Sequence, residues 1–381
     1  MKQVLGVFLA LFLTTHLIAD ETPILSNEAK ISLLTCSPGD ELYSLFGHSA
    51  LRVVDPPKGI DVVFNYGTFS FDEDFYINFA MGHLNYKLST SPMQYFMRSY
   101  EYEQRAIVEQ ELNLDSAQRQ SLLNFLDWNR QPENRVYLYD FFYNNCSSII
   151  RDVLDTALTE DVMYKNLLYA SEPSYRNLID SYLIYHPWGD FGIDLGLGTP
   201  CDKVPDHIEY MFLPDELKRA FDHASIDGRP LVSNERILLT TDGLQYTWSL
   251  TQPIPLFWIL FGFVALLSAW GYRLKKRLIA IDVLLFVSYG AVGALLFFLW
   301  FITIHTGTAN NFNMLLWAWP MHLLMLPFLW MPKIRKPYFM VYGAVLAIGL
   351  LAFPFWPQML HLAIVPIMLI GLVRAWVNWR L

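Results

Sequence analysis

Hydrophobic residues gather in the last third of the chain, in long runs that polar residues rarely interrupt. Runs of this length predict helices that span a membrane. The last run has the weakest pattern, because Arg374 falls inside it. The five predicted helices cover residues 254–272, 279–304, 314–331, 338–356 and 359–377.

The loops between these helices differ in charge, and the difference predicts an orientation. Clusters of Lys and Arg follow the first and third helices, and Arg380 follows the fifth. The other two connections, 305–313 and 357–358, contain neither residue. Because basic loops stay in the cytoplasm, we expect a multi-pass protein of the inner membrane with its N-terminal half in the periplasm.

The N-terminus has the pattern of an export signal. A short apolar run from Val4 to Leu13 follows Lys2, and Ala19 offers a cleavage position. This favours a signal peptide, residues 1–19, although an uncleaved anchor would have a similar pattern. The remaining chain then divides into a periplasmic domain, residues 20–252, and a transmembrane domain, residues 253–381.

The exported half shows both strand-like alternation and helical spacing, which predicts a mixed α+β domain. Residues 64–102 are also crowded with aromatic side chains, which fits either a core or a surface resting on lipid. The predicted strands are 51–54, 62–66 and 136–139, with a hairpin turn at 55–59, and the predicted helices are 116–129, capped by Asp115, and 147–158.

Composition agrees with a membrane protein and excludes two other classes. The 381 residues are 54% hydrophobic and 17% charged, which argues against disorder. The net charge of −9 divides unevenly, because residues 253–381 contain nine basic residues and one acid, +8, which leaves −17 for residues 1–252. An acidic domain without a basic stripe makes nucleic acid an unsuitable partner.

The chain has three cysteines, and an exported location is oxidising enough to pair two of them. Cys36 and Cys201 lie next to Pro and Gly residues that mark loops or element ends. We therefore predict a disulfide between Cys36 and Cys201, which leaves Cys146 free.

Cys146 stands where an apolar stretch turns into an amphipathic helix. A thiol at the N-terminus of a helix favours the thiolate, and the free N–H groups there can stabilise an oxyanion. Cys146 is therefore a candidate nucleophile. A buried structural cysteine is the alternative.

A cysteine nucleophile needs a base, and His48 at the start of a predicted strand is the candidate. Asn65 on the neighbouring strand could orient it. An ordinary structural histidine is the alternative. A zinc site from Cys36, His48, Cys201 and His207 lacks the close ligand pair of structural zinc sites, so we predict no metal and no cofactor.

Four stretches of the chain resemble the Lnb family of the Bacteroidota. They read CSPGDELYSLFGHSALR (36–52), FNYG (64–67), LYDFFYNNCSSIIRD (138–152) and TANNFNMLLW (308–317). The resemblance covers nearly the whole mature chain. It implies an α+β permuted papain-like periplasmic domain, similar to lecithin:retinol acyltransferase in placing His before Cys, followed by an all-α polytopic membrane domain of five helices.

The resemblance also implies an activity, since members of the family are implicated in lipoprotein N-acylation. The family's His and Cys fall on His48 and Cys146, with Asn65 as the third polar residue. A phospholipid acyl chain would form a thioester on Cys146 and then pass to the α-amine of a diacylglyceryl lipoprotein. Residues expected to bind substrate are Asn145, Tyr43 and Arg52, with His305, Asn310 and Asn313 from the outward loop.

Two other functions stay open on the residues alone. A periplasmic cysteine amidase or peptidase acting on cell-wall peptides would use the same fold and residues, although a single anchor would then suffice. A non-enzymatic membrane scaffold would need Cys146 only as a structural residue.

Overall fold

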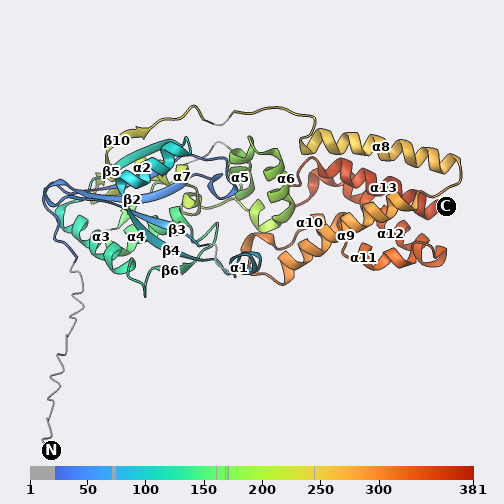
Figure 1. The fold of residues 1–381 in the computed structure, drawn as a ribbon, viewed down its shortest axis with the longest axis horizontal. Coiled ribbons are helices and arrows are strands. Elements are labelled where there is room, and N and C mark those ends of the chain that lie inside the picture. Colours follow the sequence, from blue (N-terminus) through green and yellow to red (C-terminus); the bar gives the residue numbers. More distant parts are fainter. Residues whose placement is uncertain (1–21, 71–73, 160, 168, 170, 244) are drawn as a thin grey trace, which may run out of the picture.

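The computed structural model describes residues 22–381, apart from 71–73, 160, 168, 170 and 244. The molecule is elongated, with a β-sheet and its covering helices at one end and a bundle of long helices at the other (Figure 1). The predicted signal peptide, residues 1–19, lies outside the described residues.

The N-terminal domain is built on a seven-stranded antiparallel sheet in the order β10-β5-β1-β2-β3-β4-β6. β2 and β3 form the predicted hairpin, and Gly59 ends its turn with φ +66°, a left-handed conformation that favours glycine. The strands are β1 (Lys30–Cys36), β2 (His48–Asp55), β3 (Ile60–Thr68), β4 (Asn85–Pro92), β5 (Ile107–Leu112), β6 (Val136–Leu138) and β10 (Val232–Leu239). A smaller sheet joins β7 (Val162–Met163), β8 (Ser225–Ile226) and β9 (Arg229–Pro230).

Helices cover both faces of the large sheet (Figure 1). α3 (Ser116–Asn129) and α4 (Cys146–Ala157) pack against one face of the sheet and form an apolar core with it. α2 (Met93–Tyr102) packs against the other face. α3 begins as predicted, because the Asp115 side chain accepts hydrogen bonds from the backbone N–H groups of Ala117 and Gln118. α4 begins one residue earlier than predicted, so Cys146 is its first residue.

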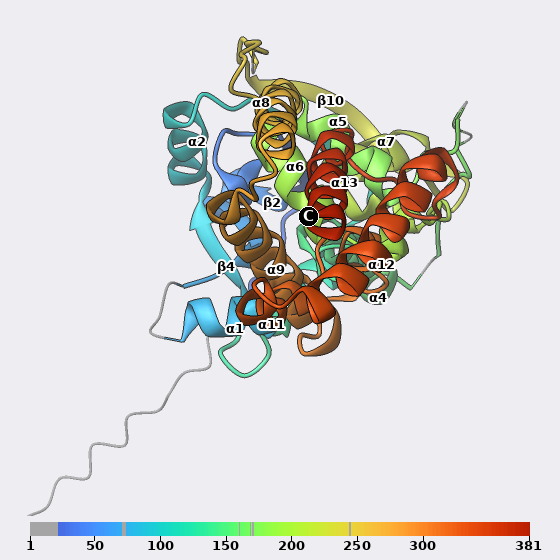
Figure 2. The ribbon, with the colours of Figure 1, turned by 90° about the vertical axis from the view of Figure 1, so that its right-hand side faces the viewer.

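The C-terminal part contains three described helices that are long and apolar enough to cross a membrane. These are α8 (Pro253–Arg273), α9 (Ile279–Phe301) and α12 (Pro332–Leu351), which match the first, second and fourth predicted helices. The fifth predicted segment overlaps α13 (Ile364–Arg380), a helix of 17 residues. Seen along the bundle, α13 lies between α8 and α12, in contact with both (Figure 2).

The third predicted helix, 314–331, is wrong as a continuous helix. The chain instead forms two five-residue helices, α10 (Phe312–Leu316) and α11 (Met321–Met325), with Pro320 at the break. The irregular backbone between them packs against α9 at Gly293, where an added Cβ would lie 2.0 Å from the carbonyl oxygen of Ala318. Non-helical backbone at membrane depth needs such burial in protein, and apolar composition alone does not reveal it.

Arg374, which interrupts the last apolar run, lies in a buried polar cluster. Its Nε donates to Asp282 Oδ1 at 2.8 Å, and its Nη1 donates to the Ser268 hydroxyl at 2.9 Å. Arg374 and Asp282 are at most 1% exposed. A charged residue can therefore occupy this helix because α9 supplies the opposite charge.

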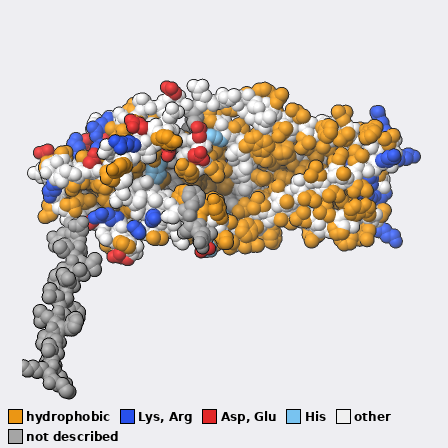
Figure 3. Space-filling model, in the orientation of Figure 1, with side chains coloured by type: hydrophobic (Ala, Val, Ile, Leu, Met, Phe, Trp, Pro, Cys, Tyr) orange, Lys and Arg blue, Asp and Glu red, His pale blue; other side chains and the backbone are white. Residues whose placement is uncertain are grey.

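Surface charge follows the predicted orientation. Apolar side chains cover most of the helical part, and Lys and Arg reappear at the tip furthest from the sheet (Figure 3). The basic clusters after α8 and at the start of α12 lie near each other, since Arg277 and Arg335 both donate to the carbonyl of Leu329. The sheet domain carries charges of both signs at the opposite end (Figure 3).

The loop that follows α9 joins the two parts of the molecule. The Gly198 N–H, just after α6 (Pro187–Gly196), donates to the carbonyl of Gly307 at 2.8 Å. A Cβ on Gly198 would lie 1.7 Å from the Ala309 oxygen, so only glycine fits this close approach. The Asn311 amide donates to the carbonyls of Leu195 and Gly196, at 2.8 and 3.1 Å. The sheet domain is thus fixed to the membrane helices by backbone contacts.

Candidate active site

Cys146 is positioned by the cap of α4. The side-chain oxygen of Asn145 accepts from the N–H groups of Ser147 and Ser148 at 2.8 and 3.0 Å. Its Nδ2 donates to the carbonyls of Phe141 and Phe212, both at 2.7 Å. Asn145 is 3% exposed. Its polar atoms are used to hold the start of α4, and the prediction that it binds substrate stays a prediction.

His48, the first residue of β2, lies beside this helix start. Its Nε2 donates to Asn65 Oδ1 at 2.5 Å, which leaves Nδ1 for the thiol of Cys146, with which the ring is hydrogen-bonded. The neighbouring strand β3 carries Asn65. The structure thus brings together Cys146, His48 and Asn65 as the sequence predicted.

Gly67 keeps the space beside this pair open. Its φ is +91°, and an added Cβ would lie 3.8 Å from Cβ of Cys146 and 3.9 Å from Cε1 of His48. Glycine therefore allows the left-handed backbone conformation, and its missing side chain leaves room beside the thiol.

Electrostatics favour an ion pair between Cys146 and His48. Burial opposes ionisation of the Cys146 thiol, but the adjacent His48 and its hydrogen bond outweigh burial and lower the pKa of the thiol. Burial likewise opposes the charge on His48, whereas Cys146 and the hydrogen bond that His48 donates to Asn65 raise the pKa of His48 overall. The attraction between thiolate and imidazolium contributes to both shifts, so the two pKa values belong to the pair.

Two serines that sequence reasoning missed support the thiol. The Ser49 backbone N–H and the Ser147 hydroxyl both bond to Cys146 and lower its pKa. The two hydroxyls also lie 2.9 Å apart, which ties β2 to α4. Their only signal in the sequence is that each directly follows one of the two reactive residues.

The predicted disulfide between Cys36 and Cys201 is wrong, since both thiols are free. Cys36 ends β1 and lies in the core that α2 covers, whereas Cys201 lies in a separate core cluster with Phe142 and Tyr175. Burial raises the pKa of each thiol to about 12. The number of cysteines and the oxidising compartment suggested a disulfide, but each of these two cysteines instead fills an apolar core as a small hydrophobic residue.

Arg52 and Tyr43, which were also predicted to bind substrate, lie in different surroundings. Arg52, four residues along β2 from His48, donates to Asp61 at 2.8 and 2.9 Å and to Glu109 at 3.1 Å. These bonds give Arg52 a role in the sheet, and its assignment to substrate stays a prediction. Tyr43 is 65% exposed, and its ring lies 6.5 Å from Phe69, two residues beyond Gly67. Tyr43 therefore lies at the rim of the site.

The outward loop 305–313 mainly joins the domains. The His305 ring bonds to the carbonyl of Phe79 at 3.0 Å, and Thr306 donates to Asp140 at 2.9 Å, in the segment that leads to Cys146. Asn313 is 1% exposed and accepts from the Trp317 indole at 3.0 Å, and its assignment to substrate binding stays a prediction. Asn310 is exposed, with φ +54°.

One group of described residues could hold a metal ion. Carboxylates of Asp180, Asp190 and Asp194 come within 4.8 Å of one another, and Arg176 donates to Asp194 at 2.6 Å. These residues belong to α5 (Tyr175–Leu183) and α6, away from the thiol. The carboxylates crowd one another, so burial and the neighbouring acids raise the pKa of Asp180 to about 8.

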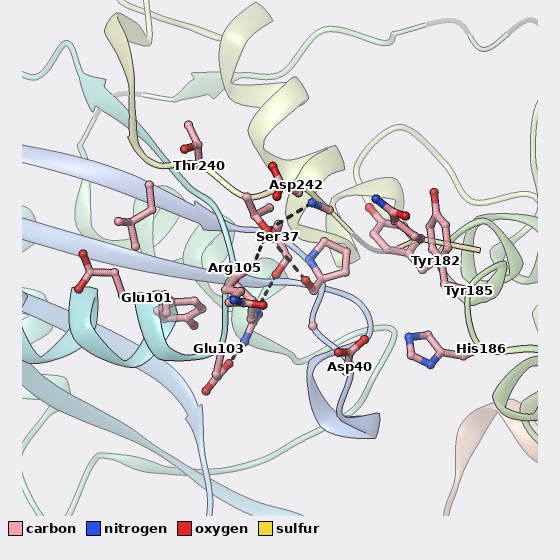
Figure 4. A pocket seen from close by; sticks show the side chains of 18 of the residues that line it. Ser37, Asp40, Glu101, Glu103, Arg105, Tyr182, Tyr185, His186, Thr240 and Asp242 are labelled. Carbon is pink, nitrogen blue, oxygen red and sulfur yellow. Dashed lines mark hydrogen bonds and ion pairs between the residues drawn. The ribbon is translucent and has the colours of Figure 1, made fainter. Parts of the chain in front are cut away.

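A separate cavity of about 830 Å³ lies where β1 ends and β5 begins, and residues after β10 also line it (Figure 4). Its walls include the charged residues Asp40, Glu101, Glu103, Arg105 and Asp242. Cys146 and His48 do not line it. Walls of this polarity suit polar groups and disfavour an acyl chain.

The thiols should differ in reactivity. We expect iodoacetamide to alkylate Cys146 in the folded protein and to spare Cys36 and Cys201, whose high pKa values and burial keep them protonated. Alkylation of Cys146 should continue well below the pKa of an ordinary thiol and fall only as its own lowered pKa is passed. Peptide mapping across a pH series measures this, and native labelling of Cys36 would contradict it.

Comparison with protein families gives two matches. A family model described as the Lnb N-terminal periplasmic domain matches residues 24–181, and one described as the Lnb transmembrane domain matches residues 245–381. No curated protein and no solved structure matches the chain. The two family matches together cover most of the chain.

Proposed function

Because the chain belongs to the Lnb family, with a periplasmic domain and a transmembrane domain, we propose that it is a thiol-dependent N-acyltransferase of lipoproteins. The donor is a phospholipid, and the acceptor is the N-terminal amine of a diacylglyceryl lipoprotein. The observation that carries the proposal is the hydrogen bond between Cys146 and His48, at the start of α4 and in a domain fixed to membrane helices.

The first half-reaction loads the enzyme. The Cys146 thiolate attacks the carbonyl carbon of a phospholipid ester, and the N-terminus of α4 stabilises the oxyanion that forms. As the C–O bond breaks, the His48 imidazolium gives its proton to the departing lysophospholipid oxygen. The acyl chain is left on Cys146 as a thioester.

The second half-reaction transfers the chain. The α-amine of the acceptor attacks the thioester carbonyl, and neutral His48 takes the proton from that nitrogen. The C–S bond breaks, an amide forms, and the thiolate–imidazolium pair returns. Asn65 acts as a positioning residue, because its hydrogen bond to Nε2 directs Nδ1 of His48 toward the thiol.

The arrangement supports the permuted papain-like fold that the resemblance implies. In chain order a strand histidine comes first, the strand with Asn65 follows, and the helix with the cysteine comes last. The basic tip of the helical part supports the inner membrane as the location, with the thiol on the periplasmic side.

A cysteine amidase acting on cell-wall peptides would use the same residues and is the alternative enzyme. It would give no function to the apolar helices that bring the site close to lipid. A scaffold would not need a thiol whose pKa is lowered.

An acyl-enzyme measurement tests the proposal. The full-length protein is mixed with phosphatidylethanolamine vesicles and its intact mass is recorded. We expect a gain of one acyl chain on the Cys146 peptide, sensitive to neutral hydroxylamine, which cleaves thioesters. Adding a synthetic diacylglyceryl-cysteine peptide should discharge the enzyme and give the triacylated peptide.

The alternatives predict other outcomes in the same assay. Release of a cell-wall peptide with a transient peptidyl adduct on Cys146 would support the amidase. Absence of any adduct on Cys146 with both substrates would support the scaffold.

A further inference from the structure

The short helix α1 (Phe75–Met81) carries exposed apolar side chains at the boundary between the two parts of the molecule. Tyr76, Ile77 and Phe79 are 74%, 66% and 47% exposed. Exposed apolar clusters of this kind mark contact surfaces, because water disfavours them.

α1 is held at the outward end of α9. The Ile304 N–H donates to the carbonyl of Met81 at 3.0 Å, and the His305 ring bonds to the carbonyl of Phe79 at 3.0 Å. Both views show α1 next to this end of the helical bundle (Figures 1 and 2). Because α9 is long and apolar enough to cross the membrane, its end sets the level of the bilayer surface, and α1 lies at that level.

A series of aromatic rings leads from α1 towards the site. The ring centroids of Phe79 and Phe75 are 5.9 Å apart, those of Phe75 and Phe69 5.5 Å, those of Phe69 and Tyr86 5.0 Å, and those of Tyr86 and Tyr139 4.5 Å. These separations are those of rings in contact. We call these five residues the aromatic track.

The inner end of the track lies beside the thiol. Phe69 comes two residues after Gly67, whose Cα faces both Cys146 and His48. Tyr139 is half-buried, and its burial together with the nearby Cys146 raises the pKa of its hydroxyl well above the ordinary range. The track therefore connects the level of the bilayer surface with the reacting atoms.

We propose that α1 rests in the outer surface of the bilayer and that the aromatic track binds the acyl chain of the donor phospholipid beside Cys146. The inference rests on the proposed function and names the surface that function uses. The charged cavity of Figure 4 is unsuited to this chain, whereas the track offers rings on which an acyl chain can pack. With its chain on the track, the phospholipid presents its ester carbonyl in the space that Gly67 leaves open.

The lipid contact can be tested without catalysis. The full-length wild-type protein is placed in phosphatidylethanolamine–phosphatidylglycerol vesicles that contain a phospholipid with a diazirine in its acyl chain. After illumination, peptide mapping should find lipid on residues 69–81 and none on α2, which carries the comparably exposed Tyr95. Equal labelling of both segments, or none on 69–81, would overturn the proposal.

A matched pair of variants tests the role in loading. Phe79→Ser should lower the rate of thioester formation from vesicle phospholipid about tenfold, the effect of removing one packed ring from an apolar contact. Its reaction with the soluble ester p-nitrophenyl acetate should match wild type, which shows that the thiol is intact. Tyr95→Ser, on the exposed face of α2, should match wild type with both substrates.

The outcomes separate the two proposals. An unchanged vesicle rate in Phe79→Ser overturns the track, and so does an equal loss with both esters, since that would mean a general effect on the site. If wild type forms no thioester from phospholipid, the proposed function fails, and diazirine labelling alone then decides whether α1 and the track contact lipid.

Discussion

Replacement of Cys146 by alanine is expected to abolish acyl transfer, with a loss of roughly a thousandfold or more. In the proposed mechanism the Cys146 sulfur carries the acyl chain, and no other described thiol can replace it because Cys36 and Cys201 are buried in separate cores. Transfer of a labelled acyl chain from phospholipid to a diacylglyceryl-cysteine peptide measures the effect. Cys201→Ala is the matched control and should keep its activity.

His48→Ala should cause a comparable loss, and the double variant Cys146→Ala/His48→Ala should be little worse than either single one, because the residues act as a unit. Asn65→Ala should lose less, since it acts through His48. Its hydrogen bond raises the pKa of His48, so its removal should move the alkaline limb of the pH profile to lower pH. Substantial transfer by Cys146→Ala would end the proposed mechanism.

Asp282→Ala should be the most damaging change to stability that the membrane region offers. It leaves Arg374, 1% exposed, without its 2.8 Å partner, and breaking a buried ion pair in this way costs about 3–5 kcal/mol. The Ser268 hydroxyl is neutral and cannot replace the lost charge, and Arg277 loses the same carboxylate, which lies 3.8 Å from its guanidinium. Thermal unfolding of the detergent-solubilised protein measures the loss.

Removing both charges provides the control for this prediction. Asp282→Leu with Arg374→Met should recover most of the stability, because no uncompensated charge stays buried. A melting temperature for Asp282→Ala equal to that of wild type would show that the pair contributes nothing to stability.

The parts of the fold that depend on neighbouring residues were predictable from the sequence. The hairpin of β2 and β3 and the cap of α3 follow from residues within a few positions of each other. The contact between His48 and Asn65 could be inferred because the hairpin places them on adjacent strands. The start of α4 was missed by one residue, since the capping bonds of Asn145 decide it.

Features that depend on distant contacts were not predictable. The break at Pro320 is stabilised because the backbone there packs against Gly293 in α9. The residues around Pro320 do not reveal this distant contact. The disulfide prediction failed because cysteine parity says nothing about which core each thiol fills. Asn145 and Asn313 were expected at the substrate because polar residues in motifs can bind ligands, and the bonds that both make to backbone or indole groups of the protein were not predicted.

The close approach of Gly198 to Ala309 has a consequence for how the enzyme responds to its host membrane. Since the sheet domain is fixed to the end of α9, the height of the thiol above the bilayer is set by helix length and not by a flexible tether. α9 has 23 residues and spans roughly 34 Å, close to the thickness of the hydrocarbon layer, about 30 Å. A thicker bilayer would draw the thiol toward the ester and a thinner one would lift it away, so bilayer thickness becomes a kinetic variable of the reaction.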